Sequence, residues 1–323
     1  MIRTLVAAAL LAGLALPASA KTVDVSAYAA TLQHSSNSQQ LIDACRNLTS
    51  ALYVTVPIGT SGQSSPNGDA ALAAMTKFVQ SGHNTQARVR CARYLGNISL
   101  VGMEPPNLKT YSPYADQAIA VLFALFKDRD PLIRAGAANA LWGIRSPAVG
   151  QALLHLANTD PSPIVVGAAF QTMFWAMKAD IAANHDAQAY DDSIARGLRS
   201  IDSDVVVGAL SAYGALHGFQ ANSVLRTYAA SDKRPAVREG AIAAFESMME
   251  WNKSITDFLE SRLSDPDINV RDRVMLELMR FGDYHALPAI QRLAKTAPTA
   301  QERASAAAYA KAMMAYEIRN RPH

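Results

Sequence analysis

The sequence predicts an all-α fold, an α-solenoid of about seven helical hairpins, and three observations lead to this prediction. A turn followed by an amphipathic helix, clearest at residues 128–144 (DRDPLIRAGAANALWGI), recurs six more times in degenerate form. Most copies lie 31–33 residues apart, which matches two helices of roughly 10 to 14 residues with short turns. Small residues fill many helix positions, so each helix must bury its apolar side against a neighbouring copy.

The first 20 residues have the pattern of a secretory signal peptide. Arg3 precedes an apolar run from Leu5 to Leu16, and Ala18-Ser19-Ala20 stands before Lys21. The run is shorter than the roughly 20 residues that a membrane span requires, which favours cleavage near Ala20 over a membrane anchor. We therefore expect a periplasmic or secreted protein.

Residues 21–68 are predicted to form N-terminal capping helices and a loop. The loop at residues 57–69 (PIGTSGQSSPNGD) lacks the Lys-Ser or Lys-Thr that follows the glycines of a P-loop, so we expect a surface loop without bound phosphate. The chain has two cysteines, Cys45 and Cys91. We expect them to form a disulfide after export, and the alternative is a pair of buried free thiols.

Residues 69–323 are predicted to form the solenoid. Two steps between copies, of 44 and 41 residues, are longer than the others. One of these insertions contains Pro105, Pro106 and Pro113, which disfavour a helix, and the other lies near residues 178–193. The copies align on the position of Arg134, which is occupied in turn by Arg90, Arg134, Val166, Val207, Arg238, Arg271 and Arg303.

The recurring order Asp, Pro, apolar, Arg, Ala, Ala, Leu resembles that of HEAT repeats, in the degenerate bacterial form grouped with phycobilisome-lyase-like repeats. The resemblance covers about residues 69–318 and implies a scaffold that binds partners. Some members of this group attach or detach chromophores, and a branch that resembles deoxyhypusine hydroxylase binds iron through His-Glu pairs. This chain has no His-Glu dipeptide, which disfavours the iron-binding branch.

The resemblance also implies structural ion pairs between the turn aspartates and the helix arginines of neighbouring repeats. On this basis we expect Asp128 to pair with Arg134, Asp232 with Arg238, and Asp265 with Arg271. Val166 and Val207 replace the arginine in two copies, so the ladder of ion pairs should be interrupted there.

Charge and motif content argue against several function classes. The net charge is only +3 and the charges alternate in sign, which disfavours a nucleic-acid-binding or anionic-membrane surface. The seven histidines lack metal-ligand spacing, and no G-x-S-x-G nucleophile motif is present. The loop that contains His185 and Asp192 could offer oxygen ligands to calcium, but it lacks the order of an EF-hand, so we expect a solvated loop. We expect no catalytic residues, no metal and no cofactor.

The most informative anomaly is a predicted helix over residues 164–177 that is apolar on nearly every side. The outward side of the preceding copy carries Asn139 and Trp142, and a step of 32 residues leads to Gln171 and Phe174. We expect these four residues to form a binding patch on the concave surface, with two aromatic rings flanked by two amides. The alternative is that both rings are core residues.

Together these features predict an exported, non-catalytic scaffold that binds a protein or peptide partner on its concave face. Two alternatives remain open at this stage. One is a cofactor-handling enzyme similar to the lyase-like members, and the other is an inhibitor or immunity protein that blocks an envelope-acting toxin.

Overall fold

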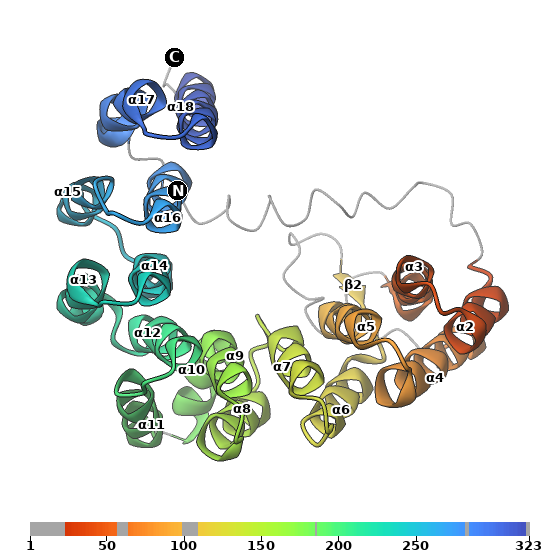
Figure 1. Cartoon of the computed structure of the whole chain (residues 1–323). Coiled ribbons are helices and arrows are strands. Elements are labelled where there is room, and N and C mark those ends of the chain that lie inside the picture. The colour runs from red at the N-terminus through yellow and green to blue at the C-terminus, as the bar shows by residue number, and fades with distance from the viewer. Residues whose placement is uncertain (1–22, 57–63, 99–108, 185, 282–283, 321–323) are drawn as a thin grey trace.

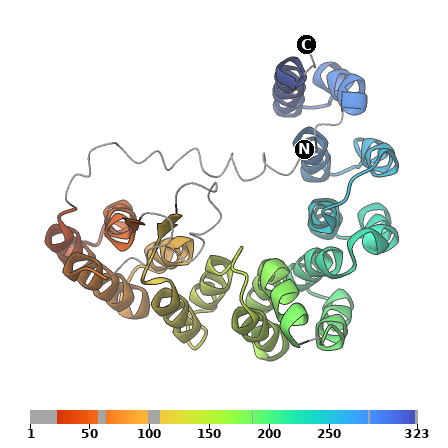
Figure 2. The same cartoon turned by 180° about the vertical axis from the view of Figure 1, so that it is seen from behind.

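The computed structural model describes residues 23–56, 64–98, 109–184, 186–281 and 284–320. Its helices form a curved row of hairpins, with one helix of each pair on the inner side of the arc and the other on the outer side (Figure 1). The view from behind shows the same single row (Figure 2). The fold is therefore the α-solenoid that the sequence predicts, and seven of the described hairpins follow residue 65. The predicted signal peptide lies outside the described residues.

The outer helices are α2 (Val25–His34), α4 (Pro66–Ser81), α6 (Ala115–Leu125), α8 (Pro147–Thr159), α11 (Gln188–Leu198), α13 (Asn222–Ser231), α15 (Lys253–Arg262) and α17 (Leu287–Thr296). The inner helices are α3 (Ser38–Thr49), α5 (Thr85–Ile98), α7 (Pro131–Ala140), α9 (Pro163–Thr172), α12 (Ser203–His217), α14 (Pro235–Ala244), α16 (Ile268–Arg280) and α18 (Ala300–Asn320). An additional helix, α10 (Phe174–Asn184), and the 3-10 turns η1 (Ser50–Leu52), η2 (Gly218–Ala221), η3 (Phe245–Met248) and η4 (Tyr284–Ala286) complete the helical elements.

Two short strands depart from the all-α prediction. Strand β1 (Val54–Val56) pairs antiparallel with β2 (Lys109–Tyr111), with Thr55 opposite Thr110. Strand β1 stands directly before the loop at residues 57–69, and β2 lies within the proline-bearing insertion, between Pro106 and Pro113. Extended chain ends that lie side by side satisfy each other's backbone N–H and C=O groups, so a minimal ladder forms there.

The predicted helix over residues 164–177 is interrupted. Helix α9 ends at Thr172, and α10 begins at Phe174. Met173 and Met177 are fully buried at this junction. The apolar character of the segment therefore reflects burial between two helices, because the insertion folds back as an extra helix against α8 and α12.

Arginines in the first turn of four inner helices join neighbouring hairpins. Arg134 donates two hydrogen bonds to the Asp160 carboxylate, of 2.7 and 2.9 Å, and one to the Asp128 carbonyl oxygen, at 2.9 Å. The predicted pairing was thus wrong in register, because each arginine holds only the backbone of its own turn and takes its carboxylate partner from the next hairpin. The four ion pairs are Arg88–Asp128, Arg134–Asp160, Arg238–Asp265 and Arg271–Glu302.

The alignment of two copies also needs correction. Arg88, which is buried, occupies the position of Arg134, whereas the aligned Arg90 is exposed. In α12 the equivalent residue is the buried Val206, and Val207 faces the inner side of the arc. The predicted alignment therefore runs two residues late in α5 and one residue late in α12.

Helices α9 and α12, where valine replaces the arginine, pack through glycine. A Cβ atom added to Gly208 would lie 2.3 Å from the Gly167 carbonyl oxygen, and one added to Gly167 would lie 2.4 Å from the Asp204 carbonyl oxygen. Only glycine allows such an approach of two backbones. At the next junction, Arg234 pairs with Asp232 and donates to the Ile201 carbonyl oxygen of the preceding turn, at 3.0 Å.

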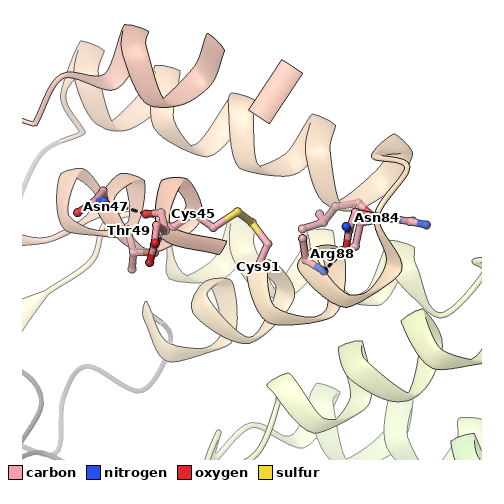
Figure 3. Close-up of a disulfide and its surroundings, with 9 residues drawn as sticks. Cys45, Asn47, Thr49, Asn84, Arg88 and Cys91 are labelled. Carbon is pink, nitrogen blue, oxygen red and sulfur yellow. Dashed lines mark hydrogen bonds between the residues drawn. A yellow bond between two sulfur atoms is a disulfide. The ribbon is translucent and has the colours of Figure 1, made fainter. Parts of the chain in front are cut away.

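The predicted disulfide is present and joins α3 to α5 (Figure 3). Cys45 and Cys91 are fully buried, and their Cα atoms are 5.4 Å apart. The bridge closes a loop with a sequence separation of 46 residues and ties the N-terminal hairpin to the first hairpin of the solenoid.

The apolar interior is divided into two clusters that meet at α12. Val205 and Ala209 belong to the N-terminal cluster, whereas Val206 and Leu210 belong to the C-terminal cluster. Two adjacent faces of one helix therefore close both cores.

Candidate functional site

The main candidate site is an open groove of about 630 Å³ across four successive inner helices, α5, α7, α9 and α12. Its floor consists of small residues, because close helix packing leaves no room for larger ones. These residues are Ala135, Gly136, Gly167, Ala168 and Gly208. We call this site the inner groove.

Two rows of exposed side chains border the floor of the inner groove. Leu132 is 50% exposed and Ile164 is 39% exposed, and each directly follows the proline that opens its helix. Asn139 and Gln171 lie about two helical turns further along α7 and α9 and are also exposed. Thr172 donates a hydrogen bond to Asn139 Oδ1 at 3.2 Å, which orients this amide. The groove therefore offers apolar contacts along one row and amide hydrogen bonds along the other.

Opposite charges stand at the two ends of the inner groove. Arg90 lies on α5 and Asp204 lies in the first turn of α12, and both side chains are exposed. Neither forms an ion pair with any residue that the structure describes. The lining residues of α7 and α9 between them are uncharged.

Two of the four residues of the predicted binding patch line the inner groove. Asn139 and Gln171 both line the inner groove, whereas Trp142 and Phe174 do not. Trp142 lies in the turn after α7 and is 49% exposed, and Phe174 is the half-buried first residue of α10. Trp142 and Phe174 each lie two residues past the end of the inner helix, α7 or α9. The helical period therefore no longer predicts the direction of their side chains.

Phe174 instead belongs to a cluster of rings and cations around the start of α10. Its ring packs edge-on against Trp175 with centroids 4.5 Å apart. The Lys178 ammonium lies 4.6 Å from the Phe174 ring centroid, and the Arg145 guanidinium lies 4.1 Å from that of Trp175. The Arg145–Trp175 contact joins α10 to the turn before α8, whereas the Lys178–Phe174 contact lies within α10.

The inner face of the C-terminal hairpins carries a network of charges. Arg273 lies 3.3 Å from Glu239 and 3.4 Å from Glu277, and Arg280 lies 2.6 Å from Glu246 and 3.6 Å from Glu277. Glu277 is fully buried. Burial raises its pKa from the ordinary 4.5 to about 7, and Glu246 adds to this effect, while Arg280 and Arg273 oppose it.

The ladder carboxylates behave in the opposite way. Burial alone would raise the pKa of Asp160, but hydrogen bonds from Arg134 and from the Ser162 amide outweigh it and lower the pKa. The pKa of Asp265 is lowered for the same reason, with Arg238 and the Asp267 amide as donors. These carboxylates stay ionised at neutral pH and serve the stacking of the hairpins.

The structure bears only in part on the predicted solvated loop near α11. His185 lies outside the described residues. Asp186 caps α11 by accepting from the Ala189 amide at 3.2 Å, and Asp192 accepts from Gln188 at 2.8 Å. Among the described residues, no three His, Cys, Asp or Glu side chains are grouped as metal ligands.

The hairpin row, in which each unit packs mainly on its neighbours, defines a repeat protein of the α-solenoid class. The chain belongs to the HEAT-repeat family. The family model described as HEAT repeats matches residues 72–173 and 222–311, which is more than half of the chain.

Several solved structures are similar to this chain at low identity. The Escherichia coli protein YibA is 16% identical over 82% of this chain and 95% of its own, with a TM-score of 0.44. Human deoxyhypusine hydroxylase, solved with glycerol, is 16% identical over 90% of this chain and 96% of its own, with a TM-score of 0.37. Kap121p is 11% identical over 85% of this chain and 32% of its own, with a TM-score of 0.47. A comparison with curated proteins finds no match.

None of the helices in the described part of the chain combines the length and apolar character that a membrane span needs.

Proposed function

We propose that this protein is an exported, non-catalytic scaffold that binds a protein or peptide partner in the inner groove. The observation that carries the proposal is the pair of exposed aliphatic residues, Leu132 and Ile164, beside the exposed amides of Asn139 and Gln171. Solvent-exposed aliphatic residues on neighbouring helices of a concave surface are typical of a binding site. Amides beside them can pair with the backbone of a bound chain.

Export is the second part of the proposal. The signal pattern of residues 1–20 and the buried Cys45–Cys91 disulfide support it, because structural disulfides persist in oxidising compartments. We expect the mature protein to begin near Lys21 and to fractionate with the periplasm or the medium. Mass spectrometry of the N-terminus tests this, and an uncleaved chain in the cytoplasm contradicts it.

The binding part is tested by affinity capture from the native envelope, with partners identified and then re-tested in purified form. We expect Leu132→Glu and the double variant Asn139→Ala/Gln171→Ala to lose most of the capture. Ile201→Glu is the matched control for the acidic substitution, because Ile201 is 96% exposed and lies outside the inner groove. Equal capture by the groove variants and the control would contradict the proposal.

Trp142→Ala and Phe174→Ala measure the aromatic residues of the predicted patch in the same experiment. Capture equal to that of the wild type discards both rings as contacts. An absorbance band beyond that of the aromatic residues, or a metal in elemental analysis of the purified protein, favours a cofactor-handling enzyme. Tight one-to-one capture of a single hydrolase favours an inhibitor.

A further inference from the structure

The two ends of the inner groove carry opposite charges, whereas its middle is uncharged. Arg90 lines the end on α5, and the exposed Arg93 lies three residues later on the same helix face. Asp204 lines the end on α12. A ligand that spans the groove therefore meets positive charge, then an uncharged stretch, and then negative charge.

The distance between these ends sets the length of the ligand. Three steps between neighbouring helices, at roughly 8–10 Å each, separate α5 from α12. An extended polypeptide advances about 3.3 Å per residue, so roughly seven to nine residues cover this span.

We infer that the inner groove binds an extended polypeptide segment with an acidic side chain over α5 and a basic side chain over α12. Small or aliphatic side chains lie between them, against the glycine and alanine floor and beside Leu132 and Ile164. This inference rests on the proposed function and specifies its partner. The charge order follows from complementarity with Arg90 and Asp204.

Other ligands fit the inner groove less well. A lipid chain needs an enclosed apolar cavity, whereas this groove is open and presents the amides of Asn139 and Gln171. A nucleic acid needs a continuous basic surface, and Asp204 would repel its phosphates.

Five blocked decapeptides with one shared uncharged centre, each labelled with an uncharged BODIPY dye, serve as probes. Two carry Glu at one end and Lys at the other, in both orders; the rest carry Lys at both ends, Glu at both ends, or no charge. Exposed ion pairs are weak, so we expect a dipolar peptide to bind about threefold to tenfold more tightly than the uncharged one. Fluorescence anisotropy at low salt measures this, and the preference should shrink at high salt. Equal affinity for all peptides overturns the inference.

Charge-reversal variants give a sharper test, because each should change which peptide is preferred. The double variant Arg90→Glu/Arg93→Glu makes both groove ends acidic, so the doubly basic peptide should become the best ligand. Asp204→Lys makes both ends basic, so the doubly acidic peptide should become the best ligand. An unchanged order of preference in both variants overturns the inference.

The matched controls are Arg129→Glu, in the turn before α7, and Asp192→Lys, on the outer helix α11, because both residues are exposed and lie outside the groove. Circular dichroism and melting temperature confirm that each variant is folded. If all peptides bind equally and Leu132→Glu weakens all of them, the charge order is wrong and the binding groove stands. If no peptide binds and Leu132→Glu leaves partner capture unchanged, the proposed function itself is wrong.

Discussion

The N-terminal and C-terminal parts of the inner face are built from the same helix positions but differ in chemistry. From α5 to α12 these positions hold small, aliphatic and amide side chains around an open groove. From α14 to α16 they hold Glu239 and Arg273, which pair with each other, and Arg273 also pairs with Glu277. Further along α16, Arg280 pairs with Glu246 and Glu277. The comparison teaches that the charged groups of the C-terminal inner face pair with one another, whereas Arg90 and Asp204 in the groove form no ion pair with any described residue.

The largest effect that we expect concerns the disulfide, which joins α3 to α5 in the N-terminal part of the chain. Removing it with Cys45→Ala/Cys91→Ala should lower the free energy of unfolding by about 4 kcal/mol in the chain-entropy model. Because hairpins interact mainly with their neighbours, the loss should be local. Hydrogen exchange should rise in α3 and α5 and stay unchanged in α16 and α18. Uniform acceleration along the chain would contradict this view of two separate parts.

The next effect concerns the arginine ladder. Arg88→Ala removes the ion-pair partner of Asp128 Oδ2 and the donor to two carbonyl oxygens, those of Val79 and Gln80, so we expect a loss of roughly 3 kcal/mol. Arg90→Ala, two residues later and exposed, is the control and should change stability by less than about 0.5 kcal/mol. Chemical denaturation measures both. Equal losses of stability in the two variants would contradict the assignment of Arg88 to the ladder position.

Glu277 makes the stability of the charged part depend on pH. Its pKa of about 7 lies above the ordinary 4.5, so its stabilising contribution is full below pH 4.5 and is lost as the pH rises through about 7. Arg273, Arg280, Glu246 and Tyr309 are the charged or titratable groups around it.

Glu277→Gln should therefore stabilise the protein at pH 8 by roughly 3 kcal/mol and flatten the change between pH 5 and 8. Melting curves at several pH values measure this. Glu239→Gln is the control, because Glu239 also pairs with Arg273 but its side chain is 35% exposed, whereas Glu277 is buried. A Glu277→Gln variant that is less stable than the wild type at pH 8 would show that its ion pairs outweigh its burial.

The smallest effect that we expect concerns the glycines beneath the inner groove. Gly208→Ala forces a Cβ against the Gly167 backbone and should cost about 2 kcal/mol. In Gly136→Ala the new Cβ lies 2.9 Å from the Val89 side chain. A side chain can move aside more easily than a backbone, so the cost should stay below about 1 kcal/mol. Thermal unfolding compares the two. A reversed order would mean that α9 and α12 can separate more easily than their packing indicates.

Much of the fold could be predicted from the sequence, because the spacing of the turn-and-helix copies records the hairpin length directly. The register failed where the local signals were weakest. Helix α5 begins after Asn84, whose side chain accepts from the Ala87 amide at 2.9 Å, without the usual Asp-Pro turn. Val89, which is only partly buried, stands two residues after the fully buried Ala87, so the aligned apolar position shifted by two residues.

The candidate site was less predictable, because it depends on where helices end. Asn139 and Gln171 lie inside regular helices, so the repeat step carries one onto the other correctly. Trp142 and Phe174 lie just past the ends of α7 and α9, where no periodic rule holds. Leu132 and Ile164 had a readable signal, since each is apolar and stands two residues before the ladder position, on the side of the helix away from the core.

The position of α12 between the two apolar clusters limits how the chain can be dissected. A fragment that stops before Ser203 leaves Val165 and Phe170 without their covering helix, and one that starts after His217 exposes Leu225 and Val237. Neither fragment has a closed interior of its own. Truncation studies of this protein must therefore retain α12 in every piece, because this one helix completes both apolar interiors.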